Sequence, residues 1–105
     1  MPCAGSSVYF STVDIFNATS GIWTTAALSV ARDSLEATSL PNQGLAIFAG
    51  GYTSSGEWDY FKTVDIFDAT SGTWSTAALS VARDSLEATS LPNQGLAIFA
   101  GGQSA

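Results

Sequence analysis

Short apolar and β-branched runs alternate with turn residues along the chain. Residues 64–67 are rich in β-formers, and 68–72 hold the Asp, Thr, Ser and Gly side chains that turns prefer. Extended character resumes at 73–76, so this stretch predicts a β-hairpin. A second hairpin is predicted over 86–100, around the turn residues 92–95. Two hairpins of this kind supply four short antiparallel strands.

The segment between these hairpins has an ambiguous pattern. Residues 77–88 contain good helix formers, with Leu79, Ala82 and Leu86 spaced three and four apart, as on one face of a helix. Turn signals on both sides and the length of the repeat favour strand, loop, strand instead. Tertiary context regularly overrides local helix propensity, so we predict no helix here.

The whole pattern occurs twice. Residues 9–51 and 60–102 form two copies within a single region, 1–105, and a linker loop over 52–59 separates them. A fixed period of this size is typical of a repeat architecture. The copies differ at four pairs of positions: Ser11/Lys62, Asn17/Asp68, Ile22/Thr73 and Thr24/Ser75.

The order of several features resembles the kelch repeat. A glycine doublet follows an apolar strand, an aromatic residue closes the next strand, a Trp comes seven residues later, and an Arg precedes the following unit. The aromatic residue is Phe where kelch units often have Tyr, so the hydroxyl is absent. The matching residues are Gly50-Gly51 and Gly101-Gly102, Phe16 and Phe67, Trp23 and Trp74, and Arg32 and Arg83.

The resemblance implies an all-β fold, a partial kelch-type β-propeller with four-stranded antiparallel blades. In that alignment residues 8–28 supply the third and fourth strands of one blade, 34–79 supply a complete blade, and 85–102 supply the first two strands of another. One full blade is thus flanked by two half blades. The chain is then either part of a longer propeller or a head-to-tail homo-oligomer in which half blades complete each other until the ring closes.

Charge and residue types exclude several classes of site. Nine acidic and three basic residues give a net charge of −6, which disfavours nucleic acid and anionic membrane surfaces as partners. The chain has no His, and Cys3 is its one cysteine, so no metal site, cofactor site or Ser-His-Asp triad is predicted. The start of the chain shows no signal-peptide pattern, which favours the cytoplasm.

Candidate binding residues lie in the loops. In a kelch-like blade, the loop between the second and third strands shares a face with the loop that links neighbouring blades. Loops on a rigid scaffold are where recognition usually resides. The structural alternatives are packing of Trp58 on a neighbouring blade and bonding of the arginines to backbone carbonyls. The candidate partner-binding residues are Trp58, Tyr52, Glu57, Asp59, Arg32 and Arg83.

These observations favour a protein-interaction scaffold with a protein partner. A structural or vestigial repeat without a partner of its own, and a carbohydrate-binding propeller, are the alternatives. An enzyme is disfavoured, because a glycosidase needs two unlike carboxylate environments and identical repeats supply identical ones.

Overall fold

The computed structural model describes residues 8–54 and 59–104. Within these residues the secondary structure consists of β-strands and two 3-10 turns, with no α-helix. The elements are β1 (Thr12–Asn17), β2 (Ile22–Ala27), β3 (Glu36–Leu40), η1 (Pro41–Gln43), β4 (Leu45–Ala49), β5 (Tyr52–Thr53), β6 (Asp59–Tyr60), β7 (Thr63–Asp68), β8 (Thr73–Ala78), β9 (Glu87–Leu91), η2 (Pro92–Gln94) and β10 (Leu96–Ala100).

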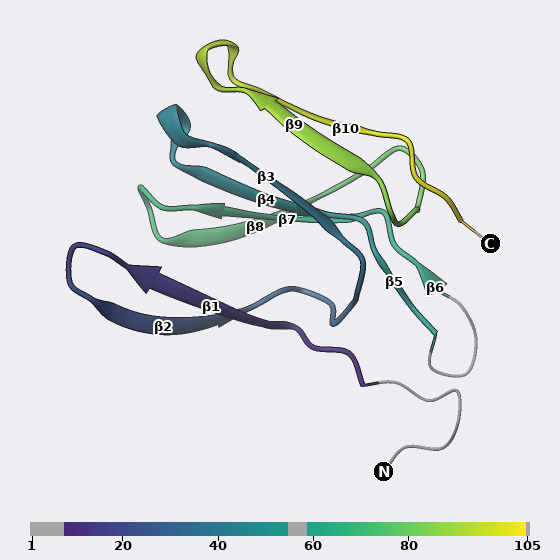
Figure 1. Cartoon of the computed structure of the whole chain (residues 1–105), viewed down its shortest axis with the longest axis horizontal. Helices are drawn as coiled ribbons and strands as arrows, with labels where there is room; N and C mark the ends of the chain where they lie inside the picture. Colours follow the sequence, from purple (N-terminus) through teal and green to yellow (C-terminus); the bar gives the residue numbers. More distant parts are fainter. Residues whose placement is uncertain (1–7, 55–58, 105) are drawn as a thin grey trace.

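The strands form three layers (Figure 1). The central layer is a four-stranded antiparallel sheet with the order β3-β4-β7-β8. The hairpin β1–β2 lies on one face of this sheet, and the hairpin β9–β10 lies on the other. The predicted all-β fold with antiparallel four-stranded pairing is therefore confirmed for the central sheet.

One face of the central sheet holds the buried core. Side chains alternate between the two faces of a strand, so Ile47 and Ala49 of β4 share a face with Val64 of β7. Ala97 and Phe99 of β10 pack against this cluster. The buried members of the cluster are Leu40, Ile47, Ala49 and Val64.

The opposite face of the sheet is aromatic. Phe67 of β7 pairs directly with Trp74 of β8, and their ring centroids lie 5.1 Å apart. Phe48 of β4 reaches the same Trp74 at 6.2 Å. Together with Val13 and Ile15 of β1, these rings line a groove of about 290 Å³ between the sheet and the first hairpin. The predicted placement of Phe67 and Trp74 on paired strands is confirmed.

The ambiguous segment 77–88 contains no helix. Strand β8 ends at Ala78, and the backbone N–H of Leu79 donates to the carbonyl of Lys62 at 2.7 Å. A connecting segment follows, in which Leu86 is buried, and β9 begins at Glu87, one residue later than the predicted start. Burial of Leu86 and backbone bonds to the preceding strand outweigh the local helix propensity.

Candidate functional site

One end of the molecule, here called the loop end, comprises the segment before β3, the short strands β5 and β6, and the segment before β9. Backbone hydrogen bonds join these segments, which are distant in sequence. Asp33 and Tyr52 form an isolated antiparallel bridge, with N–H to O distances of 3.0 and 2.9 Å. Gly51 N–H donates to the Arg83 carbonyl at 3.0 Å, and Arg83 N–H donates to the Phe61 carbonyl at 3.2 Å. The segments that lead into β3 and β9 therefore lie beside the linker, as in Figure 1, where β5 and β6 lie at the same end.

This close approach requires the glycine doublet. Gly51 has φ +106°, and a Cβ there would lie 2.6 Å from the carbonyl oxygen of Asp33. A side chain at Gly50, which has φ +76°, would lie 2.6 Å from the Arg83 carbonyl oxygen. Only glycine combines the left-handed backbone with such a short approach. The doublet is thus what holds the two connecting segments against the linker.

Three tyrosines gather on this scaffold. Tyr52 of β5 pairs with Tyr60 of β6, and their rings stack with centroids 5.9 Å apart. Tyr9 meets Tyr52 edge-on at 6.4 Å. The Tyr9 hydroxyl lies 2.6 Å from Ser54 Oγ and accepts the Ser54 N–H at 3.0 Å. The short strands β5 and β6 were not expected in the linker loop, and their pairing is what stacks the rings.

Sequence reasoning identified Tyr52 but missed Tyr9 and Tyr60. A signal was present, because Tyr9 and Tyr60 are the same position in the two copies. That identity marks the start of each repeat copy and does not place either ring beside Tyr52. The rings of Tyr9 and Tyr60 both contact Tyr52. The sequence does not predict these contacts, because Tyr52 is not repeated: its counterpart in the second copy is Gln103.

A cavity of about 350 Å³ lies next to Tyr9. Asp33 lies at its wall with an exposed side chain that accepts a hydrogen bond from Ser34 Oγ at 2.9 Å. Val8 and Phe10 are 71% and 68% exposed at the same place, so the rim is apolar as well as acidic. The cavity is lined by Val8, Tyr9, Phe10, Arg32, Asp33, Ser34 and Leu35.

The surroundings of Tyr52 raise the pKa of its phenol above the ordinary value of 10.0. Desolvation is the largest cause, and the Asp33 carboxylate, Tyr9 and the Asp84 carboxylate add to it. A hydrogen bond with Ser34 acts in the opposite direction. The phenol is therefore neutral at pH 7.

Of the other predicted binding residues, two lie outside the described part of the chain, namely Glu57 and Trp58. Asp59 is exposed on β6, where it pairs with Thr53. Asp59 therefore adds a second exposed carboxylate to the same end of the molecule as Asp33.

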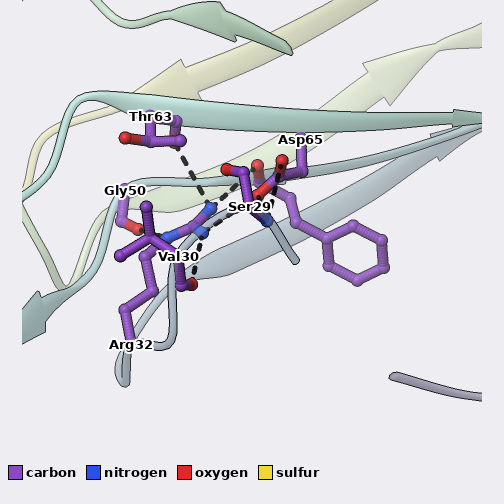
Figure 2. A network of polar contacts seen from close by, with 7 residues as sticks. Ser29, Val30, Arg32, Gly50, Thr63 and Asp65 are labelled. Atoms are coloured by element: carbon purple, nitrogen blue, oxygen red, sulfur yellow. Dashed lines mark hydrogen bonds and ion pairs between the residues drawn. The ribbon is translucent and has the colours of Figure 1, made fainter. Parts of the chain in front are cut away.

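Arg32 is buried, and its guanidinium bonds to the chain itself (Figure 2). Nε donates to the Gly50 carbonyl at 2.6 Å, and Nη1 donates to the Val30 carbonyl at 3.1 Å. Nη1 also pairs with Asp65 Oδ2 at 3.0 Å, and both side chains are almost fully buried. The guanidinium of Arg32 thus interacts with groups inside the fold, and its ion pair with Asp65 connects the segment before β3 to strand β7.

The rest of the network satisfies the remaining donors and acceptors. Nη2 of Arg32 reaches the carbonyls of Thr63 and Phe48 at 3.4 and 3.5 Å. The Ser29 N–H donates to both oxygens of Asp65 at 3.3 Å. Such completeness matters because a buried charge that loses its partners is strongly destabilising.

Arg83 repeats only part of this arrangement. Its guanidinium donates to the carbonyls of Gly101, Val81 and Phe99 at 2.6, 3.1 and 3.4 Å. Among the described residues, no carboxylate pairs with it. Arg83 is half-buried, so the sequence-identical arginines have different surroundings in the two copies.

Asp84 is buried at the same end, and its Oδ1 has no hydrogen-bond partner among the described residues. Within the described ranges, no three His, Cys, Asp or Glu side chains lie close enough together to hold a metal ion. None of the helical segments that the structure describes is long and apolar enough to cross a membrane.

These features define an all-β protein with tyrosine rings and carboxylates at its loop end. Neither a scan against protein-family models nor a search of curated protein sequences finds a match for the chain.

Proposed function

We propose that the chain is a propeller-type protein-interaction scaffold that binds a basic segment of a partner protein at its loop end. The observation that carries the proposal is the stack of Tyr9, Tyr52 and Tyr60 beside a cavity with the exposed carboxylate of Asp33. Tyrosine is enriched among the residues that dominate binding energies in protein interfaces. Recognition also commonly resides on loops that a rigid scaffold holds in place.

The propeller part of the proposal rests on the repeated sheet geometry. Each copy of the sequence contributes strands to antiparallel sheets that stack face to face, and the central sheet has four strands. Stacked four-stranded sheets are the units from which propellers are built. The kelch-like order of the glycine doublet, Phe, Trp and Arg supports the same architecture.

The charge of the loop end supports a basic partner segment. Asp33 and Asp59 are exposed there, and the net charge of the chain is −6. Lys and Arg side chains interact with carboxylates and with the faces of tyrosine rings. Such a partner would also be drawn to the acidic surface by long-range attraction, which salt weakens.

The test is a titration of the isotope-labelled chain with short synthetic peptides, followed by NMR. The peptides share one sequence, in which a set of positions is Lys in one version, Arg in a second and Glu in a third. We expect the Lys and Arg peptides to shift the amides of Asp33, Tyr52 and Tyr60, and the Glu peptide to leave them unchanged. Binding should weaken as salt is added.

The repeat itself suggests a substitution of Tyr52 that should preserve the backbone. Gln103 takes the place of Tyr52 in the second copy and forms the same backbone bridge, with Asp84 in place of Asp33. Tyr52→Gln therefore keeps a backbone arrangement that this sequence already adopts. We expect it to weaken peptide binding about tenfold or more, the loss typical of a hot-spot residue. Equal binding of acidic and basic peptides, or unchanged affinity in Tyr52→Gln, would contradict the proposal.

A further inference from the structure

In the described structure, each outer hairpin leaves open one strand edge whose counterpart in the central sheet is paired. Strand β4 lies between β3 and β7, whereas β10, its counterpart in the second copy, pairs only with β9. Strand β7 lies between β4 and β8, whereas β1, its counterpart in the first copy, pairs only with β2. The open edges of β10 and β1 are thus the counterparts of two edges that are joined in the central sheet.

The charged side chains show the same contrast between the joined edge of the central sheet and the open edges of the outer hairpins. Arg32 pairs with Asp65 across the joined edge. The counterpart of Arg32 is Arg83, which has no carboxylate partner among the described residues, and the counterpart of Asp65 is Asp14, which is exposed. The two ends therefore carry the separated halves of one ion pair.

The exposed fractions of matching apolar side chains also differ between the central sheet and the outer hairpins. Ile47 is 7% exposed and Leu40 is 5% exposed, whereas their counterparts Ile98 and Leu91 are 42% and 46% exposed. At the other end, Trp23 is 65% exposed, whereas its counterpart Trp74 is half-buried. The residue types are identical within each of these pairs. The difference arises because both faces of the central sheet are covered, whereas each outer hairpin, in the part of the chain that the structure describes, lacks a neighbouring layer on its outer face.

We propose that a second copy of this chain supplies that neighbour, by adding its β1 to the open edge of β10. The hairpins lie on opposite faces of the central sheet, which separates β10 from β1 of its own chain (Figure 1). The completed sheet has the order β9-β10-β1-β2, with the last two strands from the second copy. The contact is head-to-tail, so each chain offers both edges and chains add in one direction until a ring closes.

The register of the contact follows from the central sheet. Ile47 pairs with Ile66 there, so Ile98 pairs with Ile15 of the second copy. Phe48 pairs with Asp65 in the central sheet. The counterparts Phe99 and Asp14 therefore lie opposite each other across the contact between the two copies. The ion pair between Arg83 and Asp14 then forms across the interface, with the geometry of Arg32 and Asp65.

A disulfide cross-link tests both the partner and the register. Gly50 N–H donates to Thr63 O across the joined edge, and three steps further along the alternating ladder Ile47 and Ile66 form a non-hydrogen-bonded pair. Cα atoms in such pairs lie about 4.5 Å apart, close enough for a disulfide. The corresponding pair across the interface is Ile15 and Ile98.

The experiment uses two full-length chains, Ile15→Cys and Ile98→Cys, both in a Cys3→Ser background. Under mild oxidation we expect covalent dimers when the two are mixed, and none when either is oxidised alone. Ile47→Cys combined with Ile66→Cys in one chain is the positive control, which should close within the chain. Absence of cross-linking in the mixture, or equal cross-linking in a single-variant sample, overturns the proposal.

Analytical ultracentrifugation provides a second readout that needs no cysteine. The unmodified chain should sediment as an oligomer that dissociates on dilution. Asp14→Ala should raise the dissociation constant about tenfold or more, because it leaves the Arg83 charge unpaired in the contact. Asp59→Ala removes the same charge at the loop end and should leave the dissociation constant unchanged. A single-chain mass at all concentrations overturns the proposal.

The two proposals fail separately. Self-association depends on the strand edges, and peptide binding depends on the loop end. Asp59→Ala is expected to weaken only binding of the basic peptides, and Asp14→Ala only self-association. Loss of both activities in one of these variants, with circular dichroism unchanged, would contradict their independence.

Discussion

At the residue scale, the repeat places identical side chains in unlike surroundings. Arg32 and Arg83 make the same three backbone hydrogen bonds, within about 0.1 Å, to the carbonyls of matching residues. They differ because Arg32 has two further partners on β7, the buried carboxylate of Asp65 and the Thr63 carbonyl. The energetic role of this one residue type can therefore be measured twice in one molecule.

Replacement of Arg32 by Ala is expected to destabilise the fold strongly. The substitution leaves Asp65 buried without its cation, a loss that typically costs about 3–5 kcal/mol. Arg83→Ala should cost less, about 1–3 kcal/mol in the isolated chain, because it removes hydrogen bonds to backbone carbonyls but leaves no buried carboxylate without its cation. Urea denaturation measures both, performed in the Asp14→Ala background on protein diluted below the dissociation constant of that variant so that single chains unfold. Similar losses for the two variants would contradict the structural role of the Arg32 ion pair.

Sequence reasoning anticipated part of this network. Bonding of the arginines to backbone carbonyls was one of the two roles considered for them, and the structure shows those bonds in both copies. In the sequence, Asp65 is the one polar residue within the stretch 64–67 and carries no further signal of its partner. Its pairing with Arg32 depends on how far the connecting segment folds back across the sheet, and local sequence does not encode that distance.

At the element scale, the hairpin strands and the four-stranded central sheet were predictable from the sequence, and the short strands of the linker were not. Turn residues and the runs of β-forming residues between them located the hairpin strands to within a few residues. The short strands β5 and β6 escaped prediction, because each has two residues and the pairing depends on the path imposed by the glycine doublet. The Gly/Ser-rich composition of the linker predicts a loop and carries no signal for this pairing.

Hydrogen exchange is expected to separate the central sheet from the outer hairpins. In the monomeric Asp14→Ala chain, the Ile47 amide lies in a strand with neighbours on both sides, whereas the Ile98 amide lies in an edge strand. An isolated hairpin is marginal in water, so it opens more often. We expect the Ile98 amide to exchange about tenfold faster or more, a difference of roughly 1.4 kcal/mol in opening free energy. Mass spectrometry or NMR provides the measurement.

The unmodified chain at high concentration is the control for this experiment. Pairing of β10 with a second copy gives Ile98 neighbours on both sides, so its protection should rise toward that of Ile47. Equal exchange of the two amides in the Asp14→Ala monomer would show that the outer hairpin is as stable as the central sheet. That result would remove the energetic reason for edge pairing.

At the scale of the whole molecule, the structure has three stacked layers and a surface that is apolar at both outer layers. Phe16, Ile22 and Trp23 are exposed on the first hairpin, and Leu91, Leu96 and Ile98 are exposed on the last. Exposed apolar surface of this kind on a strand edge is a typical site of association. The sequence predicted the two-unit pattern and its unpaired ends, but which side chains stay exposed depends on how the layers stack.

The stability of the chain should therefore depend on its concentration. If a second copy binds only the folded chain, each tenfold rise in concentration above the dissociation constant adds about 1.4 kcal/mol to the free energy of unfolding. For a chain of this size, that gain corresponds to a rise in Tm of roughly 5 °C. Differential scanning calorimetry over a concentration series measures it. In Asp14→Ala the same rise should begin only at a concentration about tenfold higher or more, because the loss of the ion pair raises the dissociation constant. A constant Tm for the unmodified chain would mean that folding is complete without a neighbour, and that the exposed edges of β1 and β10 are tolerated as they are.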